Sequence, residues 1–277
     1  MQIVSKNILK KVYPKRRKDA HKGDFGKLLV IAGSHMFIGA PVLASLAAYR
    51  SGTDIVTLAS PQRTADIAAK ISDIITYPLY GDFLSVSHVN KIKELSEGKN
   101  ALLIGPGLGE EKQTMKAIRK IVSKIDKPMI IDADGIKAMK KYRSLKKSIL
   151  FTPHSHEFEI LSNTNIGNKL NEKIKSVNSL ANSTETVILL KGNPDIISNG
   201  IGTCINKTGN AYMTVGGTGD VLSGICASLV SQGNDLFSSA CAASYINGRA
   251  GDIVARKKKQ AMIASDLLEA IISVIKT

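Results

Sequence analysis

The run GGTGD at residues 216–220 is the part of the chain whose residue types best suit chemistry. Glycines surround Thr218, Asp220 follows them, and an apolar, helix-like stretch comes next. Glycine N–H groups and the positive end of a helix together form a site for phosphate. A carboxylate there could take the proton from an attacking hydroxyl. The competing interpretation is a turn in which Asp220 only stabilises a helix start; local sequence favours neither.

A second run, TPHSHE, places His154, His156 and Glu157 where a strand is expected to give way to a helix. No third spaced His or Cys accompanies the histidines, so no zinc-type centre is expected. Glu157 could reach a phosphate-bound Mg²⁺, which prefers carboxylate oxygen and water, or could simply lie in the first helical turn. The DADG run with Asp132 and Asp134 is interpreted more readily as a helix N-cap than as a metal or substrate contact.

The elements around these runs predict one α/β architecture. Short Val- and Ile-rich runs alternate with amphipathic segments, which indicates a three-layer α/β/α sandwich with a central, mostly parallel sheet. The glycine-rich and polar runs follow expected strands, and ligands bind beyond the carboxyl ends of such strands. The expected strands lie in residues 27–34, 54–60, 101–109, 127–135, 148–154 and 186–192, a hairpin follows at 195–209, and three helices begin near Thr218, Leu236 and Ala264.

The bulk composition, 43% hydrophobic and 22% charged in 277 residues, is typical of a globular protein. No apolar run approaches the roughly 18 residues that a membrane span needs, and the N-terminus lacks a signal-peptide core. The three cysteines are widely spaced and form no CxxC pair. These features predict a cytoplasmic protein with no membrane partner. They also favour a single domain over residues 1–277, with residues 1–21 as a basic N-terminal extension.

The formal net charge is +15, and basic residues cluster at 10–27, 137–147 and 256–259. Nucleic-acid binding is one interpretation of such a surface. Aromatic residues make up only 5% of the chain and do not interleave with the basic runs, and no helix-turn-helix, zinc-finger or RNP pattern is present. We therefore expect no nucleic-acid partner, and favour a solvated basic surface or one that steers a polyanionic small molecule.

In chain order, the runs HKGDFGKLLVIAGS, GAPVLA, GPGLG, IIDADG, TPHSHEFEIL, LLKGNPD, NKTGNAYMTVGGTGDVLSGICASLVSQG and AGD resemble the NAD(P)H-hydrate dehydratases of the ribokinase-like superfamily. The resemblance extends from about Lys22 to near the C-terminus, and corresponds to the C-terminal domain of the bifunctional nicotinamide repair enzymes. It implies a ribokinase-like fold and a hydro-lyase. Such an enzyme phosphorylates the C6 hydroxyl of the (S)-hydrate of NADH or NADPH and eliminates phosphate, converting ADP to AMP.

The resemblance also implies a role for each matching position. Asp220 would be the catalytic base, in contact with the substrate, and Gly217, Thr218 and Gly219 would form the anion hole. Glu157 would act through Mg²⁺. The hydrated dinucleotide would contact Ala40, Gly107 and His154, and the nucleotide would contact Lys191, Gly192, Asn193, Pro194, Asp195 and Gly219.

Two positions depart from the family pattern. His156 stands where the family usually has glycine, and Pro194 lacks the N–H that the nucleotide loop usually offers. The resemblance further implies Mg²⁺, ADP (with ATP as the alternative donor), a homo-oligomer such as a tetramer, and an epimerase activity on a separate chain. A ribokinase-like kinase of a small alcohol, such as a vitamin precursor, is the alternative function. It would share GGTGD but accumulate a phosphate ester.

Overall fold

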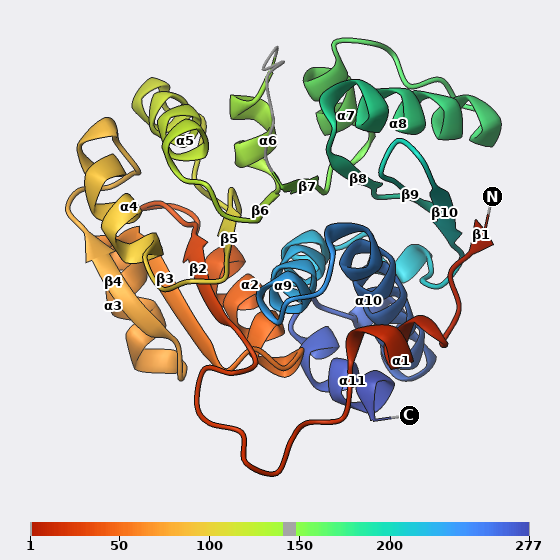
Figure 1. Cartoon of the computed structure of the whole chain (residues 1–277), viewed down its shortest axis with the longest axis horizontal. Coiled ribbons are helices and arrows are strands. Elements are labelled where there is room, and N and C mark those ends of the chain that lie inside the picture. The colour runs from red at the N-terminus through yellow and green to blue at the C-terminus, as the bar shows by residue number, and fades with distance from the viewer. Residues whose placement is uncertain (1, 141–147, 277) are drawn as a thin grey trace.

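A computed structural model describes residues 2–140 and 148–276, and within them ten strands form one sheet (Figure 1). The strand order is β1-β10-β9-β8-β7-β6-β5-β2-β3-β4. Neighbours pair in parallel except β9, which is antiparallel to both β8 and β10. The strands are β1 (Gln2–Ile3), β2 (Lys27–Ile31), β3 (Ile55–Pro61), β4 (Ile75–Leu79), β5 (Ala101–Ile104), β6 (Met129–Ile131), β7 (Ile149–Phe151), β8 (Val187–Leu190), β9 (Asp195–Ser198) and β10 (Thr203–Asn206).

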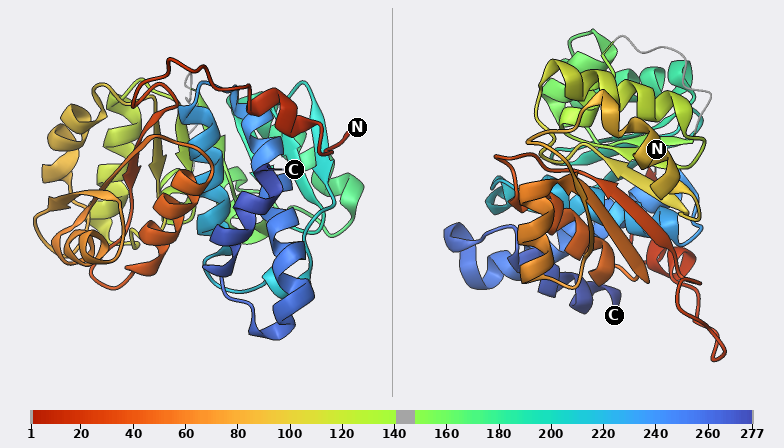
Figure 2. Two further views of the ribbon diagram at one scale, coloured as in Figure 1. Left: turned by 90° about the horizontal axis from the view of Figure 1, so that it is seen from below. Right: turned by 90° about the vertical axis from the view of Figure 1, so that its left-hand side faces the viewer.

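Helices cover both faces of this sheet, as Figures 1 and 2 show. One face carries α2, α9, α10 and α11, and the other carries α4 to α8. Among the described residues no helix is both long and apolar enough to cross a lipid bilayer. The helices are α1 (Ile8–Val12), α2 (Gly39–Arg50), α3 (Gln62–Ile71), α4 (Val89–Ser96), α5 (Lys112–Lys124), α6 (Asp134–Ala138), α7 (Ser155–Ser162), α8 (Leu170–Thr184), α9 (Thr218–Ser231), α10 (Leu236–Lys258) and α11 (Asp266–Ile275).

Strand β2 shows how the sequence builds two cores from one sheet. Successive strand residues point to opposite faces: Leu28 and Val30 join the core beneath α2 and α9, whereas Leu29 and Ile31 join the core beneath α4 and α5. Because both faces are buried, a parallel strand reads as a continuous apolar run.

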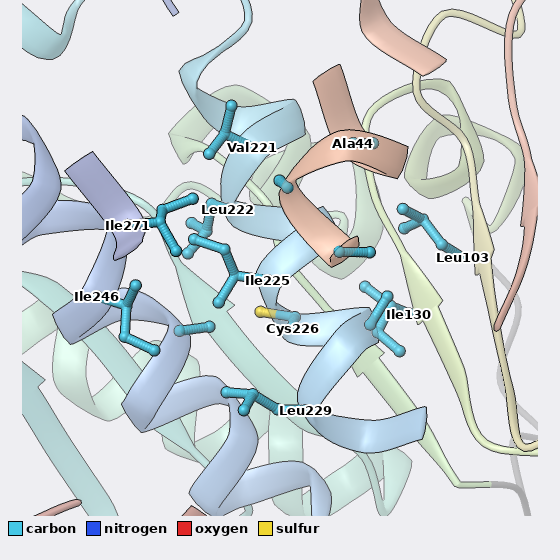
Figure 3. Packing of buried hydrophobic residues seen from close by; sticks show 14 of the residues in the cluster. Ala44, Leu103, Ile130, Val221, Leu222, Ile225, Cys226, Leu229, Ile246 and Ile271 are labelled. Atoms are coloured by element: carbon cyan, nitrogen blue, oxygen red, sulfur yellow. The ribbon is translucent and has the colours of Figure 1, made fainter. Parts of the chain in front are cut away.

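Helix α9 is the central helix of its layer, and nearly every residue from Val221 onward is buried. Figure 3 shows its apolar side chains surrounded by those of α2, α10, α11 and the sheet. Gly224 lets α9 touch α2, because a Cβ there would lie 2.2 Å from the carbonyl oxygen of Ala44. The GGTGD run is therefore the start of a helix fixed at the middle of the molecule.

The expected strands, the hairpin and the three closing helices are all present. Sequence analysis missed β1, β4, α3, α4 and α8. The expected basic extension contains β1, which adds a parallel edge strand beside β10, and α1. Figure 2 shows the rest of that segment, before β2, standing out from the body of the molecule. The second basic cluster, at 137–147, lies largely outside the described residues.

The chain reverses its direction of sheet growth between β2 and β5. From β2 it proceeds outward to β3 and β4, and then returns to place β5 on the other side of β2. The loops that follow these two strands touch, with Gly33 N–H donating to the carbonyl of Pro106 at 2.8 Å. Such a switch point is where open parallel sheets bind ligands.

Candidate functional site

The first turn of α9 is shaped by Gly217. Its φ of +98° favours glycine, and a Cβ there would lie 2.7 Å from Leu43 Cδ1 and 2.8 Å from Ala264 Cβ. Thr218 Oγ1 donates to the carbonyl of Met213 at 3.0 Å and thus fixes the entry of the chain. The first N–H groups of a helix lack intrahelical acceptors, so this turn offers donors to an anion.

Lys191, which follows β8, brings a cation to the same place. Its Nζ lies 2.9 Å from Asp132 Oδ1 and 3.6 Å from Glu157 Oε2. A Cβ built on Gly219 would lie 3.4 Å from Nζ, so the ammonium group faces the start of α9. Burial works against the charge, but the attraction of Asp132 and Glu157 outweighs it and raises the pKa of Lys191. The site therefore holds a permanent positive charge.

Asp220 lies half-buried in the first turn of α9. Burial raises the pKa of Asp220 to about 7, and repulsion by the carboxylate of Asp132 acts in the same direction. A base whose pKa lies near the working pH is suited to proton transfer. The position of Asp220 in the first turn of α9 also fits the local alternative, a carboxylate that favours the helix dipole.

Glu157 and His154 form a reciprocal cap at the start of α7. His154 N–H donates to Glu157 Oε2 at 2.8 Å, and Glu157 N–H donates to His154 Nδ1 at 3.3 Å. The second carboxylate oxygen of Glu157 lies 3.3 Å from His154 Nε2. Burial lowers the pKa of His154, which favours a neutral imidazole. Glu157 thus orients His154 and Lys191 together.

Asp132 corrects an expectation from the sequence. The N-cap position of α6 is held by Ala133, with φ +48°, and no side chain caps the helix. Gly135 N–H donates to the backbone carbonyl of Asp132, not to its side chain. The carboxylate of Asp132 accepts from Lys191 Nζ, and the residue is 1% exposed. Asp134 accepts from Gly109 N–H at 2.9 Å and ties the loop after β5 to α6.

A cavity of about 530 Å³ opens beside these groups. Asp195 is fixed at its edge by Gly192 N–H at 2.8 Å and Ser244 Oγ at 2.5 Å. Pro194 follows a cis peptide bond and is not among the lining residues. Those residues come from five separate stretches of the chain and are His154, Lys191, Gly192, Asn193, Asp195, Thr208, Gly209, Asn210, Ala211, Met213, Thr214, Thr218, Gly219, Leu222, Asn247 and Gly248.

Ala40 and Gly107 lie together at the switch point. A Cβ on Gly107, whose φ is +64°, would lie 3.3 Å from Ala40 Cβ and 2.8 Å from Phe37 Cβ. Neither residue lines the cavity. The start of α9 links the two places, because Gly217 contacts Leu43 of α2 whereas Gly219 faces the cavity.

Sequence reasoning missed three parts of the site: the stretch Thr208–Thr214, Asn247, and the partnership of Asp132 with Lys191. The stretch Thr208–Thr214 directly precedes GGTGD and belongs to the same run that carries the family resemblance, so its place next to GGTGD could have marked it as part of the site. Asn247 lies in an apolar helix with nothing in its surroundings to single it out. For Asp132, the position directly after a buried strand was the available clue.

Residues 28–273 match the model of a family described as NAD(P)H-hydrate dehydratase. The chain belongs to this family. An ADP-dependent (S)-NAD(P)H-hydrate dehydratase of Nitrosopumilus maritimus is 38% identical over 272 residues, which cover 97% of this chain and 95% of the relative. The bifunctional NAD(P)H-hydrate repair enzyme Nnr of Pyrobaculum aerophilum is 41% identical over 94% of this chain and 52% of the relative. The chain therefore spans about half the length of the bifunctional relatives.

A solved structure shares the fold. The ADP/ATP-dependent NAD(P)H-hydrate dehydratase of Bacillus subtilis, co-crystallized with ATP and Mg²⁺, superposes with a TM-score of 0.87 at 26% identity, over 99% of this chain and 98% of that one. The expected membership of the NAD(P)H-hydrate dehydratase family and the expected three-layer, ribokinase-like fold are both confirmed. The roles expected for individual residues stay predictions.

Proposed function

We propose that the protein is a nucleotide-dependent dehydratase that restores NADH or NADPH from its (S)-hydrate. The observation that carries this proposal is that the first turn of α9 adjoins both the cavity and the region where Ala40 meets Gly107. A cavity of nucleotide size lies on one side of the first turn of α9, and the Ala40–Gly107 contact lies on the other. Asp220 lies in that first turn, and the ammonium group of Lys191 faces it.

The first step is phosphoryl transfer from ADP to the C6 hydroxyl of the hydrate. Asp220 takes the hydroxyl proton as the oxygen attacks the β-phosphorus, and AMP leaves. Backbone N–H groups at Gly217, Thr218 and Gly219 stabilise the transferring group, and the ammonium of Lys191 adds a fixed positive charge. The rigid contacts of Lys191 with Asp132 and Glu157 keep that charge in position.

The second step needs little from the protein. The lone pair of the ring nitrogen expels phosphate from C6, because phosphate is a far better leaving group than hydroxide. Loss of the C5 proton to solvent then restores the reduced ring. Ala40, Gly107 and His154 hold the dinucleotide during both steps. The small residues Ala40 and Gly107 allow close approach of the substrate to the backbone.

Mg²⁺ enters with the nucleotide in this proposal. Within the described residues no three His, Cys, Asp or Glu side chains are grouped to hold a metal ion, and both oxygens of Glu157 already contact His154 or Lys191. The donor set therefore fits an ion carried by phosphate oxygens and water. The expected role of Glu157 toward this ion would run through coordinated water.

ADP is the proposed phosphate donor, with AMP as product. The support is the full-length likeness to the relative named ADP-dependent, whereas the Bacillus subtilis protein is named for both ADP and ATP. Lys191 to Asp195, together with Gly219, would hold the nucleotide at the cavity.

Recovery of the reduced nicotinamide absorbance tests this function. The hydrate is mixed with the protein, Mg²⁺ and either ADP or ATP, and the nicotinamide products are separated. Regenerated NADH with one nucleotide establishes the activity and names the donor. A stable phosphate ester formed from a small alcohol, without NADH recovery, would instead establish the alternative kinase.

We also propose that the protein is a cytoplasmic homo-oligomer. The free cysteines at 204, 226 and 241 fit a reducing compartment. Exposed apolar side chains at Met36, Phe37 and Tyr80 are candidates for a subunit contact, and light scattering of the purified protein tests it. We place the epimerase for the other hydrate epimer outside these 277 residues, because the dehydratase model matches most of them.

A further inference from the structure

Phe37 presents an exposed aromatic side chain beside the contact between Ala40 and Gly107. The residue is 48% exposed, and a Cβ built on Gly107 would lie 2.8 Å from Phe37 Cβ and 3.4 Å from the Phe37 carbonyl oxygen. Phe37 is not among the residues that line the 530 Å³ cavity. Its accessible surface therefore belongs to the proposed dinucleotide end of the site, where a ligand can reach it directly.

The backbone that carries Phe37 is held by hydrogen bonds to three elements. Phe37 N–H donates to Ser34 Oγ at 3.3 Å, and Thr64 Oγ1 of α3 donates to the carbonyl of Ser34 at 2.7 Å. His35 N–H donates to the carbonyl of Asp82, in the loop after β4, at 2.6 Å. A ring carried by a fixed backbone is already in position when a ligand arrives, so less conformational freedom is lost on binding.

A cation lies against the same loop. Arg63 Nη1, from α3, donates to the carbonyl of His35 at 2.7 Å, and Arg63 is exposed. Within residues 2–140 and 148–276 no carboxylate forms a salt bridge with Arg63, and Asp66, the acid nearest to it in sequence, accepts from Gln62 Nε2 with both oxygens. A single exposed ring is common on protein surfaces, but a guanidinium beside it adds donors that suit phosphate. The two groups together favour a nucleotide.

The position of Phe37 along α2 indicates which half of the dinucleotide it meets. In the proposed function the reacting ring lies at the first turn of α9, near Asp220. Gly217 of that turn contacts Leu43 of α2. Ala40 lies three residues before Leu43, about 4.5 Å along the helix axis, and Phe37 lies farther still, before α2 begins. The part of the substrate that reaches Phe37 is therefore the half that does not react.

We propose that Phe37 stacks on the adenine ring of the hydrated dinucleotide, so that the adenosine half of the substrate lies over residues 35–37. An aromatic side chain and a purine base stack through their π faces, and the guanidinium of Arg63 faces the negative charge of the same half. The phosphate donor is not the occupant, because its proposed cavity does not include Phe37. This inference rests on the proposed function.

Steady-state kinetics with two hydrates, those of NADH and of reduced nicotinamide mononucleotide, test the assignment. The second substrate keeps the reacting ring and lacks the adenosine half. With MgADP or MgATP as donor, wild-type protein should have a kcat/KM for NADH hydrate at least about tenfold above that for the shorter hydrate, the size of one stacked base. In Phe37→Leu this ratio should fall about tenfold, whereas Phe37→Tyr, which keeps the ring, should preserve it. Because the ratio compares two substrates on one variant, a general loss of activity does not affect it.

Tyr80→Leu is the matched control. Tyr80 is 91% exposed and lies in the neighbouring loop that contacts His35, but the atoms nearest to the Cβ position of Gly107 belong to Phe37 and Ala40. The substrate ratio of this variant should equal that of the wild type. An equal fall in Tyr80→Leu overturns the inference, because the effect would then be common to the exposed rings of this surface.

A ratio that Phe37→Leu leaves unchanged also overturns the inference. Equal losses on both hydrates would place Phe37 at the reacting ring, and a smaller mass of this variant in light scattering would place Phe37 in a subunit contact. A wild type that does not prefer NADH hydrate to the shorter hydrate overturns the inference as well. In each of these cases the proposed function stands, whereas folded wild-type protein that restores neither hydrate overturns both.

Discussion

The two ends of the site are built in opposite ways. At the proposed nucleotide end, a cavity is lined by polar groups from the loop after β8, the stretch 208–214 and α10. At the proposed substrate end, the loop after β5 meets the first turn of α2 through Gly107 and Ala40, beside the half-exposed Phe37. The first end can recognise a ligand by fixed hydrogen bonds, whereas the second offers a close, apolar approach to backbone. The start of α9 adjoins both, so in the proposed function a phosphoryl group passes between them.

Asp220→Asn should produce the largest effect and should separate chemistry from nucleotide binding. An amide cannot take the hydroxyl proton, so turnover should fall by about 10²–10⁴-fold, while ADP affinity changes by no more than about threefold. Steady-state rates and calorimetry measure the two. Asp66→Asn, an exposed carboxylate that bonds Gln62 on α3, is the control and should be neutral. A fully active Asp220→Asn protein would remove the base from the account.

Lys191→Met should act mainly at the nucleotide end, by lowering ADP affinity about 100-fold. It should also destabilise the fold by about 3 kcal/mol, because Asp132 would be left as a buried carboxylate without its cation and Glu157 would keep only its contacts with His154. Calorimetry and thermal unfolding report the two effects. Adding Asp132→Asn should restore part of the stability but none of the affinity. Recovery of affinity in the double variant would show that Lys191 acts only as a structural partner.

Gly107→Ala should act only at the substrate end. The new methyl group would meet Phe37 Cβ and Ala40 Cβ, so the KM for the hydrate should rise about tenfold with unchanged ADP affinity, an effect comparable to other small packing changes in a binding pocket. Gly109→Ala is the matched control, since its φ is also positive but no atom lies within 4 Å of its Cβ position. An equal KM increase in both variants would assign the effect to backbone strain.

The dependence of kcat/KM on pH should be the smallest of these effects, and its direction follows from the pKa of Asp220. Asp220 acts as a base only when deprotonated, and burial raises its pKa to about 7. The kcat/KM should therefore rise with pH through about 7 and level off above it. Asp132→Asn removes a repelling carboxylate, so the midpoint should move to lower pH. A midpoint that stays unchanged in this variant would contradict the coupling between the two carboxyl groups.

The sequence predicted those parts of the site that are contiguous runs, and missed those that tertiary packing brings together. GGTGD and KGNPD are each an unbroken run of residues, so each can be recognised in the sequence by itself. The continuous apolar strands show which edge of the sheet such runs reach. The architecture and the start of α9 were therefore predictable. Asn247 was not, because an asparagine in an apolar helix acquires its meaning only from α10 packing on β9 and the loop after β10. Asp132 was misread because the positive φ of Ala133 turns its carboxylate away from the helix that it precedes.

The most direct test of the central claim is the stoichiometry of a single reaction mixture. NADH hydrate, MgADP and the protein are incubated, and NADH, AMP and inorganic phosphate are quantified together by chromatography. The account predicts equal amounts of all three, and none with Asp220→Asn. AMP formed together with a lasting phosphorylated product, and without NADH, would contradict it, because the two ends of the site would then complete only a kinase reaction.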